Sequence, residues 1–465
     1  MFTYQDLEAV GQSEKERIEF ARKAITNHKM TDEYLAAKDA EAYYAKHNVT
    51  IEKFKRFLTD VYGRKVPDLF GANYKLKTGM FRRFVIQQTQ YVLSNGVTFE
   101  KDDTKEKLGK DFDYQVQKAA KKALIGGVSF CFWNLDHLEV FGLADTEKEP
   151  GFVPLRDVEN GSLKAGIRYW AYGNNEVQRW TLYELDGYTE YIKRGDEEAT
   201  IFKEKQPYIK TTKSTLAGGI EAELGENYPG FPIIPVYGND VRESELVGLR
   251  EAIDCYDLIK SGFANNIEQA TEIFWLIKNA GGMDDIDLTQ FLERMRAVKA
   301  ASLPDGVDAD AHTMNIPTDA REKMLALLKA DLYEDAQIVD VKALASGNKT
   351  ATEIRAAYQP MDDKCGDFEY QIREFIRQLF ALVGIEDEPS FKWNRIANQT
   401  EETQMVLTAA PYLDDESILK HLPWLTPEEV DEILKRRDAE DAARLNDLAD
   451  IETENEEEID KSAEE

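Results

Sequence analysis

The sequence has 465 residues, enough to bury a sizeable core, and 42% of them are apolar, which is compatible with a globular protein. Its 88 acidic residues outnumber its 58 basic ones, so the formal net charge is −30. Because nucleic acids and anionic membranes attract Lys and Arg, this charge excludes bulk electrostatic attraction to either, and any DNA contact must be local or weak.

No feature of the sequence indicates secretion or membrane insertion. The cysteines Cys131, Cys255 and Cys365 are widely separated and lie outside any C-x-x-C pair, which favours buried thiols in a reducing compartment over disulfides or zinc. The first residues lack a basic region followed by an apolar run, so no signal peptide is expected. No apolar window approaches the length of a membrane span.

The first 240 residues predict an α+β domain. Helices rich in Glu, Lys, Ala and Tyr are expected from about Ser13 to Leu58. A helix and a turn into a strand at Asn95–Phe99 follow, and short runs between Gly, Asn and Asp turns predict β structure from Leu138 to about Lys210. The Gly-rich stretch Thr211–Gly230 is expected to be a loop. Four aromatic side chains of the first helices are expected to be buried anchors: Tyr34, Tyr43, Tyr44 and Phe54.

The stretch from Phe231 to Thr318 has the clearest pattern. An apolar strand within Phe231–Asp240 leads into a long amphipathic helix from about Ser244 to Glu272. Apolar residues three or four positions apart form one stripe on this helix, the spacing of a packing face. The stripe consists of Leu246, Leu249, Ile253, Tyr256, Ile259, Phe263, Ile267 and Ala270.

A short insertion separates this helix from a second one. The insertion is expected to contain a strand at Ile273–Ile277, a helix around Leu288–Val298 and a strand near Met314–Ile316. The second helix has Asp319 and Glu322 at capping-box spacing near its start.

The last third of the sequence is mainly helical. A non-periodic loop is expected at Val339–Asn348, then a long helix, Thr350–Val383, which Pro360 should kink or divide. The strand Ser390–Trp393 is expected to return to the first domain. Beyond Arg437, thirteen acidic residues face two basic ones, which predicts a fraying helix and a disordered acidic tail.

No motif predicts catalysis, a cofactor or a metal ion. Gly347–Thr350 ends like a P-loop, but the earlier glycine and the Gly-Lys pair are missing. Acidic pairs are too abundant to be informative. We therefore expect a non-enzyme without a cofactor. Five histidines share no motif with a nucleophile or with metal-ligand spacing: His28, His47, His137, His312 and His421.

Two segments resemble the portal, or head-to-tail connector, proteins of tailed bacteriophages. The first combines Pro-Val-Tyr-Gly-Asn at 235–239, Ser-Glu-Leu at 244–246, Ile-Asp-Cys-Tyr-Asp at 253–257 and Asn-Asn-Ile-Glu at 265–268. The second is the Asn-x-Lys-Leu segment at 73–76, followed by a helix that ends before a Gly-Val pair. The likeness is strongest over these segments and extends over most of the chain.

The resemblance implies an α+β portal fold with an α/β wing, a two-helix stem, a small α/β clip and a helical crown. In this chain the implied parts are wing 1–240 and 350–400, stem helices 243–272 and 317–336, clip 273–316, tunnel loop 339–349, and crown 401–465 with its acidic tail.

The resemblance also implies a homo-oligomeric ring, twelve subunits in the virion, at one capsid vertex. Double-stranded DNA would pass through the ring during packaging and ejection. The implied partners are the terminase large subunit, a head–tail adaptor, and the major capsid and scaffolding proteins, with no membrane. The implied location is the virion, and the host cytoplasm during assembly. The main alternative is a non-channel virion structural or scaffolding protein, and a cytosolic enzyme with an unrecognised site is a more distant one.

Each DNA phosphate that a protein neutralises adds affinity, and tight binding would stop the DNA from moving. A ring of twelve such acidic chains would neutralise few phosphates, so DNA could slide through it. Relatives often carry Ser-Gly-x-Ala-Leu after the tunnel loop, which differs from Ser346–Thr350, so the loop boundary is open by a few residues. The residues expected to face DNA are Lys329, Lys342, Ser346, Asn348 and Lys349. The expected clip contacts with the terminase are Asp284, Asp285, Asp287, Arg294 and Arg296.

Overall fold

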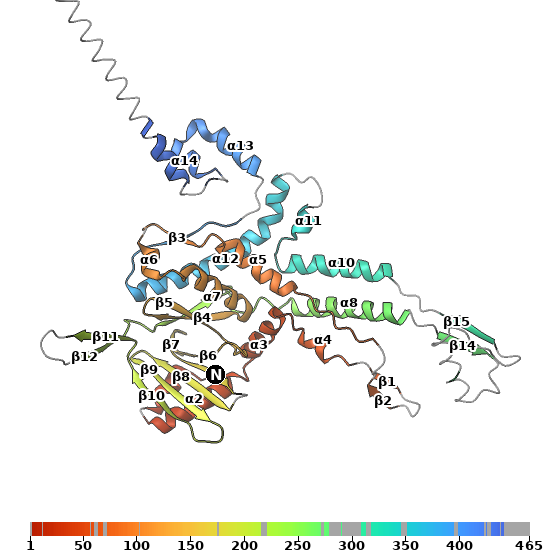
Figure 1. Cartoon of the computed structure of the whole chain (residues 1–465), viewed down its shortest axis with the longest axis horizontal. Coiled ribbons are helices and arrows are strands. Elements are labelled where there is room, and N and C mark those ends of the chain that lie inside the picture. The colour runs from red at the N-terminus through yellow and green to blue at the C-terminus, as the bar shows by residue number, and fades with distance from the viewer. Residues whose placement is uncertain are drawn as a thin grey trace, which may run out of the picture. The chain divides into compact units, whose positions relative to one another are not determined.

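The computed structural model of the chain forms two compact units (Figure 1). Unit 1 comprises Met1–Asp340 and Gln359–Asn394, and unit 2 comprises Val341–Tyr358 and Arg395–Glu465. The residues that the structure describes are 2–11, 13–55, 57–59, 64–67, 72–101, 103–173, 176–214, 221–270, 274–278, 290, 308–312, 318–345, 351–394, 399–422, 425, 429–437 and 439–440.

Unit 1 begins with four helices: α1 (Tyr4–Val10), α2 (Glu14–His28), α3 (Asp32–Tyr44) and α4 (Val49–Lys53). Side-chain caps on α1, α3 and α4 satisfy backbone N–H groups that a helix leaves unpaired at its start. The side chain of Asn48, for example, accepts hydrogen bonds from the N–H groups of Thr50 and Ile51 at the start of α4.

The predicted aromatic anchors are only partly confirmed. Tyr34 and Tyr43 are buried and Tyr44 is half-buried. Phe54 is 51% exposed, so its expected burial is wrong. The reason is local: α4 ends at Lys53, one residue earlier, and the chain turns away there in an extended conformation.

An eight-stranded sheet confirms the β structure expected after Leu138. Its strand order is β10-β9-β8-β7-β6-β5-β4-β13, and neighbours are antiparallel except β5 and β6. The strands are β4 (Val128–Asn134), β5 (His137–Gly142), β6 (Gly151–Arg156), β7 (Leu163–Tyr172), β8 (Val177–Glu184), β9 (Gly187–Arg194), β10 (Thr200–Gln206) and β13 (Ile233–Tyr237).

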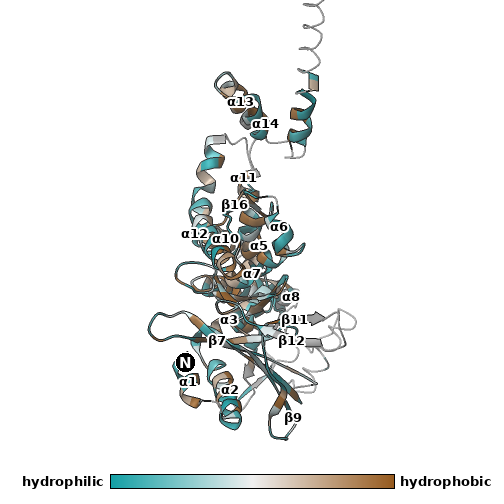
Figure 2. Ribbon diagram, turned by 90° about the vertical axis from the view of Figure 1, so that its left-hand side faces the viewer, coloured by the Kyte–Doolittle hydropathy of each residue, from teal (hydrophilic) through white to brown (hydrophobic). Residues whose placement is uncertain are grey.

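Helices pack on this sheet through apolar side chains. Figure 2 shows α1 and α2 beside strands β7 and β9. Phe20 and Ala24 of α2 pack against Ile167, Trp180 and Tyr191 of the sheet, all of them buried. Burial of this apolar surface supplies the main driving force for folding this part of unit 1.

The loop expected at Thr211–Gly230 is wrong at 211–214 and at 221–226, which are strands. Strands β11 (Ile209–Ser214) and β12 (Glu221–Glu226) form an antiparallel hairpin in which Thr211 pairs with Leu224. Side chains with strong β propensity, such as Ile209, Thr211 and Thr212, occupy the first strand, and pairing satisfies the backbone groups that a loop would expose.

Unit 1 also contains three helices before the sheet and a short two-stranded pairing. Helices α5 (Met80–Leu93), α6 (Thr104–Leu108) and α7 (Phe112–Gly126) precede the sheet. The returning strand expected near Ser390 is present as β16 (Pro389–Phe391), which pairs with β3 (Val97–Phe99).

Helix α12 (Ala351–Val383) runs without a break through Pro360, so the expectation that proline divides it is wrong. The boundary between the two units nevertheless falls beside this proline, between Tyr358 and Gln359. The helix continues because a buried stripe after the proline holds it in unit 1. That stripe is Met361, Cys365, Phe368, Ile372, Phe375, Ile376 and Leu379.

Unit 2 is helical among its described residues, as the sequence predicts for its C-terminal part. It contains α11 (Val341–Ala345), α13 (Gln399–Ala409), a short 3₁₀ turn (Ala410–Tyr412), α14 (Asp415–Lys420) and a helical stretch at 429–437. The loop expected at Val339–Asn348 is wrong at Val341–Ala345, where backbone hydrogen bonds form a short helix. Arg437 Nη1 lies 2.6 Å from Asp415 Oδ2 and joins the last two helices. The expected acidic tail lies almost wholly outside the described residues.

The first long helix begins later than the sequence predicts. The structure has α8 at Arg250–Ala270, whereas helix was expected from Ser244. Gly248 has φ +83°, a left-handed conformation that interrupts a right-handed helix. Residues 245–249 form turns instead, and the buried side chains of Leu246 and Leu249 precede the helix rather than belong to it.

One face of α8 is polar and buried. Asp257 is 0% exposed, Ser261 4% and Asn265 9%. Each accepts a hydrogen bond from a backbone N–H of the extended segment 72–78: Thr78 to Asp257 Oδ1 at 3.0 Å, Leu76 to Ser261 Oγ at 2.9 Å, and Tyr74 to Asn265 Oδ1 at 2.6 Å. We call these three side chains the polar seam.

The periods of the two elements match. Four residues of helix rise about 6 Å, and two residues of extended chain rise about 6.6 Å. Every fourth residue of α8 therefore meets every second N–H of the segment. Because leaving the three buried acceptor side chains unpaired would be costly, the seam holds the segment along the helix.

The Asp257 carboxylate is the best-enclosed group of the seam. Its Oδ2 accepts a hydrogen bond from Asn48 Nδ2 at 3.1 Å, so it also joins α8 to the cap of α4. Burial raises the pKa of Asp257, against the lowering effect of the hydrogen bonds from Asn48 and Thr78.

We expect Asp257→Asn to destabilise the protein by about 1–3 kcal/mol. Both carboxylate oxygens of Asp257 accept hydrogen bonds, so the side-chain NH₂ of an asparagine there would face another donor, either the Thr78 N–H or the Asn48 amide. Asn48 cannot turn over to relieve this, because its Oδ1 already caps α4. Denaturant unfolding measures the change, with Glu251→Gln on the exposed face of α8 as the control. Equal unfolding midpoints for Asp257→Asn and the wild type would contradict a stabilising seam.

We also expect stability to fall on mild acidification because of His28. This side chain is 1% exposed, its Nε2 lies 3.1 Å from Leu143 O, and burial lowers its pKa. The unfolded chain therefore binds the proton first, and stability is lost as the pH falls below about 6.5. Between pH 7.5 and 5.5, the thermal midpoint of the wild type should drop further than that of His28→Gln. Parallel losses in the two proteins would rule this out.

Candidate functional site

The candidate site is the pair of long helices α8 and α10 (Thr318–Asp335), which lie side by side in unit 1 (Figure 1). The guanidinium of Arg321 on α10 lies 5.8 Å from the ring centre of Phe263 on α8. At its other end α10 is anchored to α5: Arg83 Nη1 donates to Tyr333 Oη at 2.8 Å, and the Tyr333 ring packs edge-on against Phe84.

The predicted apolar stripe of α8 becomes less buried along the helix. Ile253 is 2% exposed, Tyr256, Ile259 and Phe263 are half-buried, and Ile267 is 50% exposed. The side chain of Ala270 lies outside what the structure describes. Only the base of this stripe is therefore core in a single chain.

Other apolar side chains of the helix pair are exposed as well. Leu258 on α8 is 43% exposed, and Met324 and Leu327 on α10 are 40% and 56% exposed. Large apolar side chains that share one pair of helices and face water are typical of a surface that contacts another protein.

The structure describes two of the five predicted DNA-facing residues, one in each unit. Lys329 lies on α10 in unit 1, where its Nζ is 2.5 Å from Asp340 Oδ2 and lies over the ring of Tyr333. Lys342 is an exposed residue of α11 in unit 2. Ser346, Asn348 and Lys349 lie outside the described residues.

The predicted clip contacts also lie outside the described residues, as does the strand near Met314–Ile316. Of the helix expected around Leu288–Val298 the structure describes only residue 290, which is helical. The structure does describe β14 (Phe274–Lys278), where a strand is expected. It pairs antiparallel with β15 (Asp308–His312), which precedes the second strand expected from the sequence. The unplaced clip residues are Asp284, Asp285, Asp287, Arg294 and Arg296.

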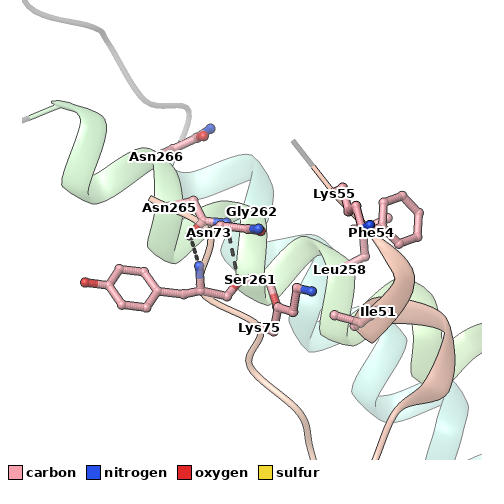
Figure 3. A pocket seen from close by; sticks show the side chains of 11 residues that line it. Ile51, Phe54, Lys55, Asn73, Lys75, Leu258, Ser261, Gly262, Asn265 and Asn266 are labelled. Carbon is pink, nitrogen blue, oxygen red and sulfur yellow. Dashed lines mark hydrogen bonds between the residues drawn. The ribbon is translucent and has the colours of Figure 1, made fainter. Parts of the chain in front are cut away.

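A groove of about 170 Å³ runs beside the polar seam, and sequence reasoning missed it (Figure 3). Side chains from three segments line it: the end of α4, the extended segment 72–78 and helix α8. None of them is acidic, and two are lysines. The lining residues are Ile51, Phe54, Lys55, Asn73, Tyr74, Lys75, Leu258, Ser261, Gly262, Asn265 and Asn266.

The groove is amphipathic. Ile51 and Leu258 supply apolar surface, while Phe54 and Tyr74, about half-exposed, stand at its margins. Lys75 donates from Nζ to the carbonyl oxygen of Glu52 at 2.8 Å, which fixes its stem and keeps its positive charge. Such a lining fits an apolar side chain accompanied by a carboxylate.

Metal and membrane chemistry find no support in the described part of the chain. Its residues contain no group of three or more His, Cys, Asp or Glu side chains placed to hold a metal ion. Among the described helices, none combines the length and the apolar character that crossing a bilayer requires.

Comparison with known proteins gives relatives of similar length. A portal protein of Clostridium phage phiCD119 is 23% identical over 420 residues, which cover 83% of this chain and 88% of the relative. A portal protein of Bacillus phage SPP1 is 26% identical over 393 residues, which cover 82% and 75% of the two chains.

Two solved structures align at a TM-score of 0.40, one of the neck of an empty gene transfer agent particle (11% identity) and one of a native particle's virion (12% identity). Each alignment covers 73% of this chain and 88% of the other. The family described as phage portal protein, SPP1 Gp6-like, matches residues 22–443. That match spans most of the sequence, and the chain therefore belongs to this family of phage portal proteins.

Proposed function

We propose that the chain is the subunit of a portal ring at one capsid vertex, through which double-stranded DNA is packaged and later ejected. The observation that carries this proposal is the pair α8–α10, whose apolar side chains are left exposed in a single chain. Membership of the portal family supports it.

The exposed side chains explain why the chain would assemble. Ile267, Leu258, Met324 and Leu327 are 40–56% exposed. Contact with another protein would remove further apolar area of each from water, at about 25 cal/mol per Å². Contacts between different surfaces of identical subunits close into a ring when the rotation allows it.

In this ring, α8 and α10 would form the stem, and β14 and β15 would belong to the clip that meets the terminase and later the head–tail adaptor. Residues 1–240 and 350–400 would form the wing, and 401–465 the crown. The major capsid and scaffolding proteins would contact the outside. The location would be the virion, after assembly in the host cytoplasm.

The charge of the chain suits a channel that DNA slides through. A net charge of −30 per subunit opposes tight phosphate binding, and a few lysines can guide the duplex. Lys342 and Lys349 remain the proposed guides. Lys329 is a weaker one, because Asp340 compensates its charge within the same chain.

The alternative is a virion structural or scaffolding protein without a channel, in which α8 and α10 pack in an ordinary bundle. The same exposed side chains would then mediate open or elongated assemblies. The shape of the assembly separates the two functions.

We expect the purified protein to form closed rings with a central hole. Negative-stain images should show cyclic symmetry, and native mass spectrometry should give one dominant oligomer, near twelve subunits. A monomer or dimer at every salt and protein concentration tested would overturn the portal-ring proposal. Elongated or open assemblies would favour the scaffolding alternative.

We expect the double variant Lys342→Ala/Lys349→Ala to form normal rings but to package several-fold less DNA per ATP hydrolysed, because two cationic guides near the duplex are removed. In vitro packaging with the cognate motor measures this. The exposed pair Lys15→Ala/Lys148→Ala is the control for loss of charge alone. Packaging at the wild-type level in the double variant would remove these lysines from the channel.

A further inference from the structure

Gly262 lies in the middle of α8, where the described part of the chain does not require a glycine. Its φ is not positive, and among the described residues no atom outside its own stretch of helix lies within 4 Å of where its Cβ would be. A glycine inside a helix costs about 1 kcal/mol relative to alanine. A glycine that costs stability and meets open space fits a place where something outside the chain comes close.

Gly262 lines the groove beside the polar seam, so the side chains of this groove surround the open space and determine which ligand fits it. Lys55 and Lys75 supply positive charge, Ile51 and Leu258 supply apolar surface, and no lining side chain is acidic. The lysines of this groove are complementary in charge to acidic faces, and acidic residues outnumber basic ones 88 to 58 in another copy of the chain.

Helix α10 presents a matching face. Five of its residues recur at steps of four, three, four and three, so they share one side of the helix. The first three are apolar and the last two are acidic. Met324 and Leu327 are 40% and 56% exposed, and Asp331 is half-buried. The face consists of Ala320, Met324, Leu327, Asp331 and Glu334.

We propose that the groove beside Gly262 receives helix α10 of the adjacent copy of this chain, with Leu327 of that copy seated over Gly262 and its Asp331 or Glu334 paired with Lys55 or Lys75. Each α8 then lies between its own α10 and that of its neighbour. The inference rests on the proposed ring and names the surfaces that close it.

The two surfaces differ, and this matters for symmetry. A groove on α8 that accepts a face of α10 is a head-to-tail contact, which generates rings rather than two-fold dimers. Packed helices lie 8–10 Å apart depending on the side chains between them, and a glycine at the crossing permits the closer approach.

The first test enlarges Gly262. We expect Gly262→Leu to fill the groove and raise the subunit concentration needed for half-assembly at least about tenfold, the scale of an overpacked contact. Gly366→Leu is the matched control, since Gly366 is also a helical glycine with open space around its Cβ position. Mass photometry of a dilution series measures ring content.

The outcomes separate this inference from the proposed function. If the wild type forms no rings, the portal-ring proposal fails, and this inference fails with it. If the wild type forms rings and Gly262→Leu assembles at the same concentration, only the groove contact is wrong. An equal loss in Gly262→Leu and Gly366→Leu would also overturn it.

A second test identifies the occupant. In rings of a Cys255→Ser background, Gly262→Cys combined with Leu327→Cys should give covalent multimers with a short bismaleimide, seen as a ladder on denaturing gels. Cys131 and Cys365 are buried and should not react. Either single substitution should give none. Rings without a ladder, or a ladder from Gly262→Cys alone, would exclude α10 of the neighbour.

Discussion

Three hydrogen bonds between an extended segment and one helix face position the long helix of this chain. The N–H groups of Tyr74, Leu76 and Thr78 have their acceptors on Asn265, Ser261 and Asp257, nearly two hundred residues later in the sequence. Each buried polar group left unpaired costs about 1–3 kcal/mol, so losing the segment would destabilise this face of the helix. The segment and α8 therefore adopt their places together.

This polar seam divides the surface of α8 between two tasks. The face that meets segment 72–78 is satisfied by hydrogen bonds inside the chain, so it needs no apolar side chains. The apolar stripe is available for helix packing. It is buried near Ile253, and at Ile267 it is exposed. One face of α8 is thus hydrogen-bonded within the chain, and another face exposes apolar side chains. The first face can stabilise the fold of a single chain, while the second can contact a neighbouring protein.

The sequence predicts the stripe and the β structure well, because their periods are local. It places the start of α8 too early. Leu246 and Leu249 have the apolar spacing of a helix, although the left-handed conformation of Gly248 prevents a helix there. The polar seam escapes prediction for a different reason. Asp257, Ser261 and Asn265 recur every fourth residue, but such residues usually mark a solvated face. Only their pairing with a distant segment, invisible in one sequence, shows that they are buried.

The polar character of the seam also fixes register, which an apolar contact would not do as strictly. Sliding segment 72–78 along α8 by one residue would move every N–H by about 3.3 Å and turn it away from its acceptor. Apolar side chains tolerate such shifts better, because their attraction has no direction. The register pairs Tyr74 with Asn265 and Leu76 with Ser261, and so brings Lys75 and the ring of Tyr74 to the border of the groove. The hydrogen bonds of the polar seam, all within one chain, thereby determine the shape and charge of the groove that we propose contacts the adjacent subunit.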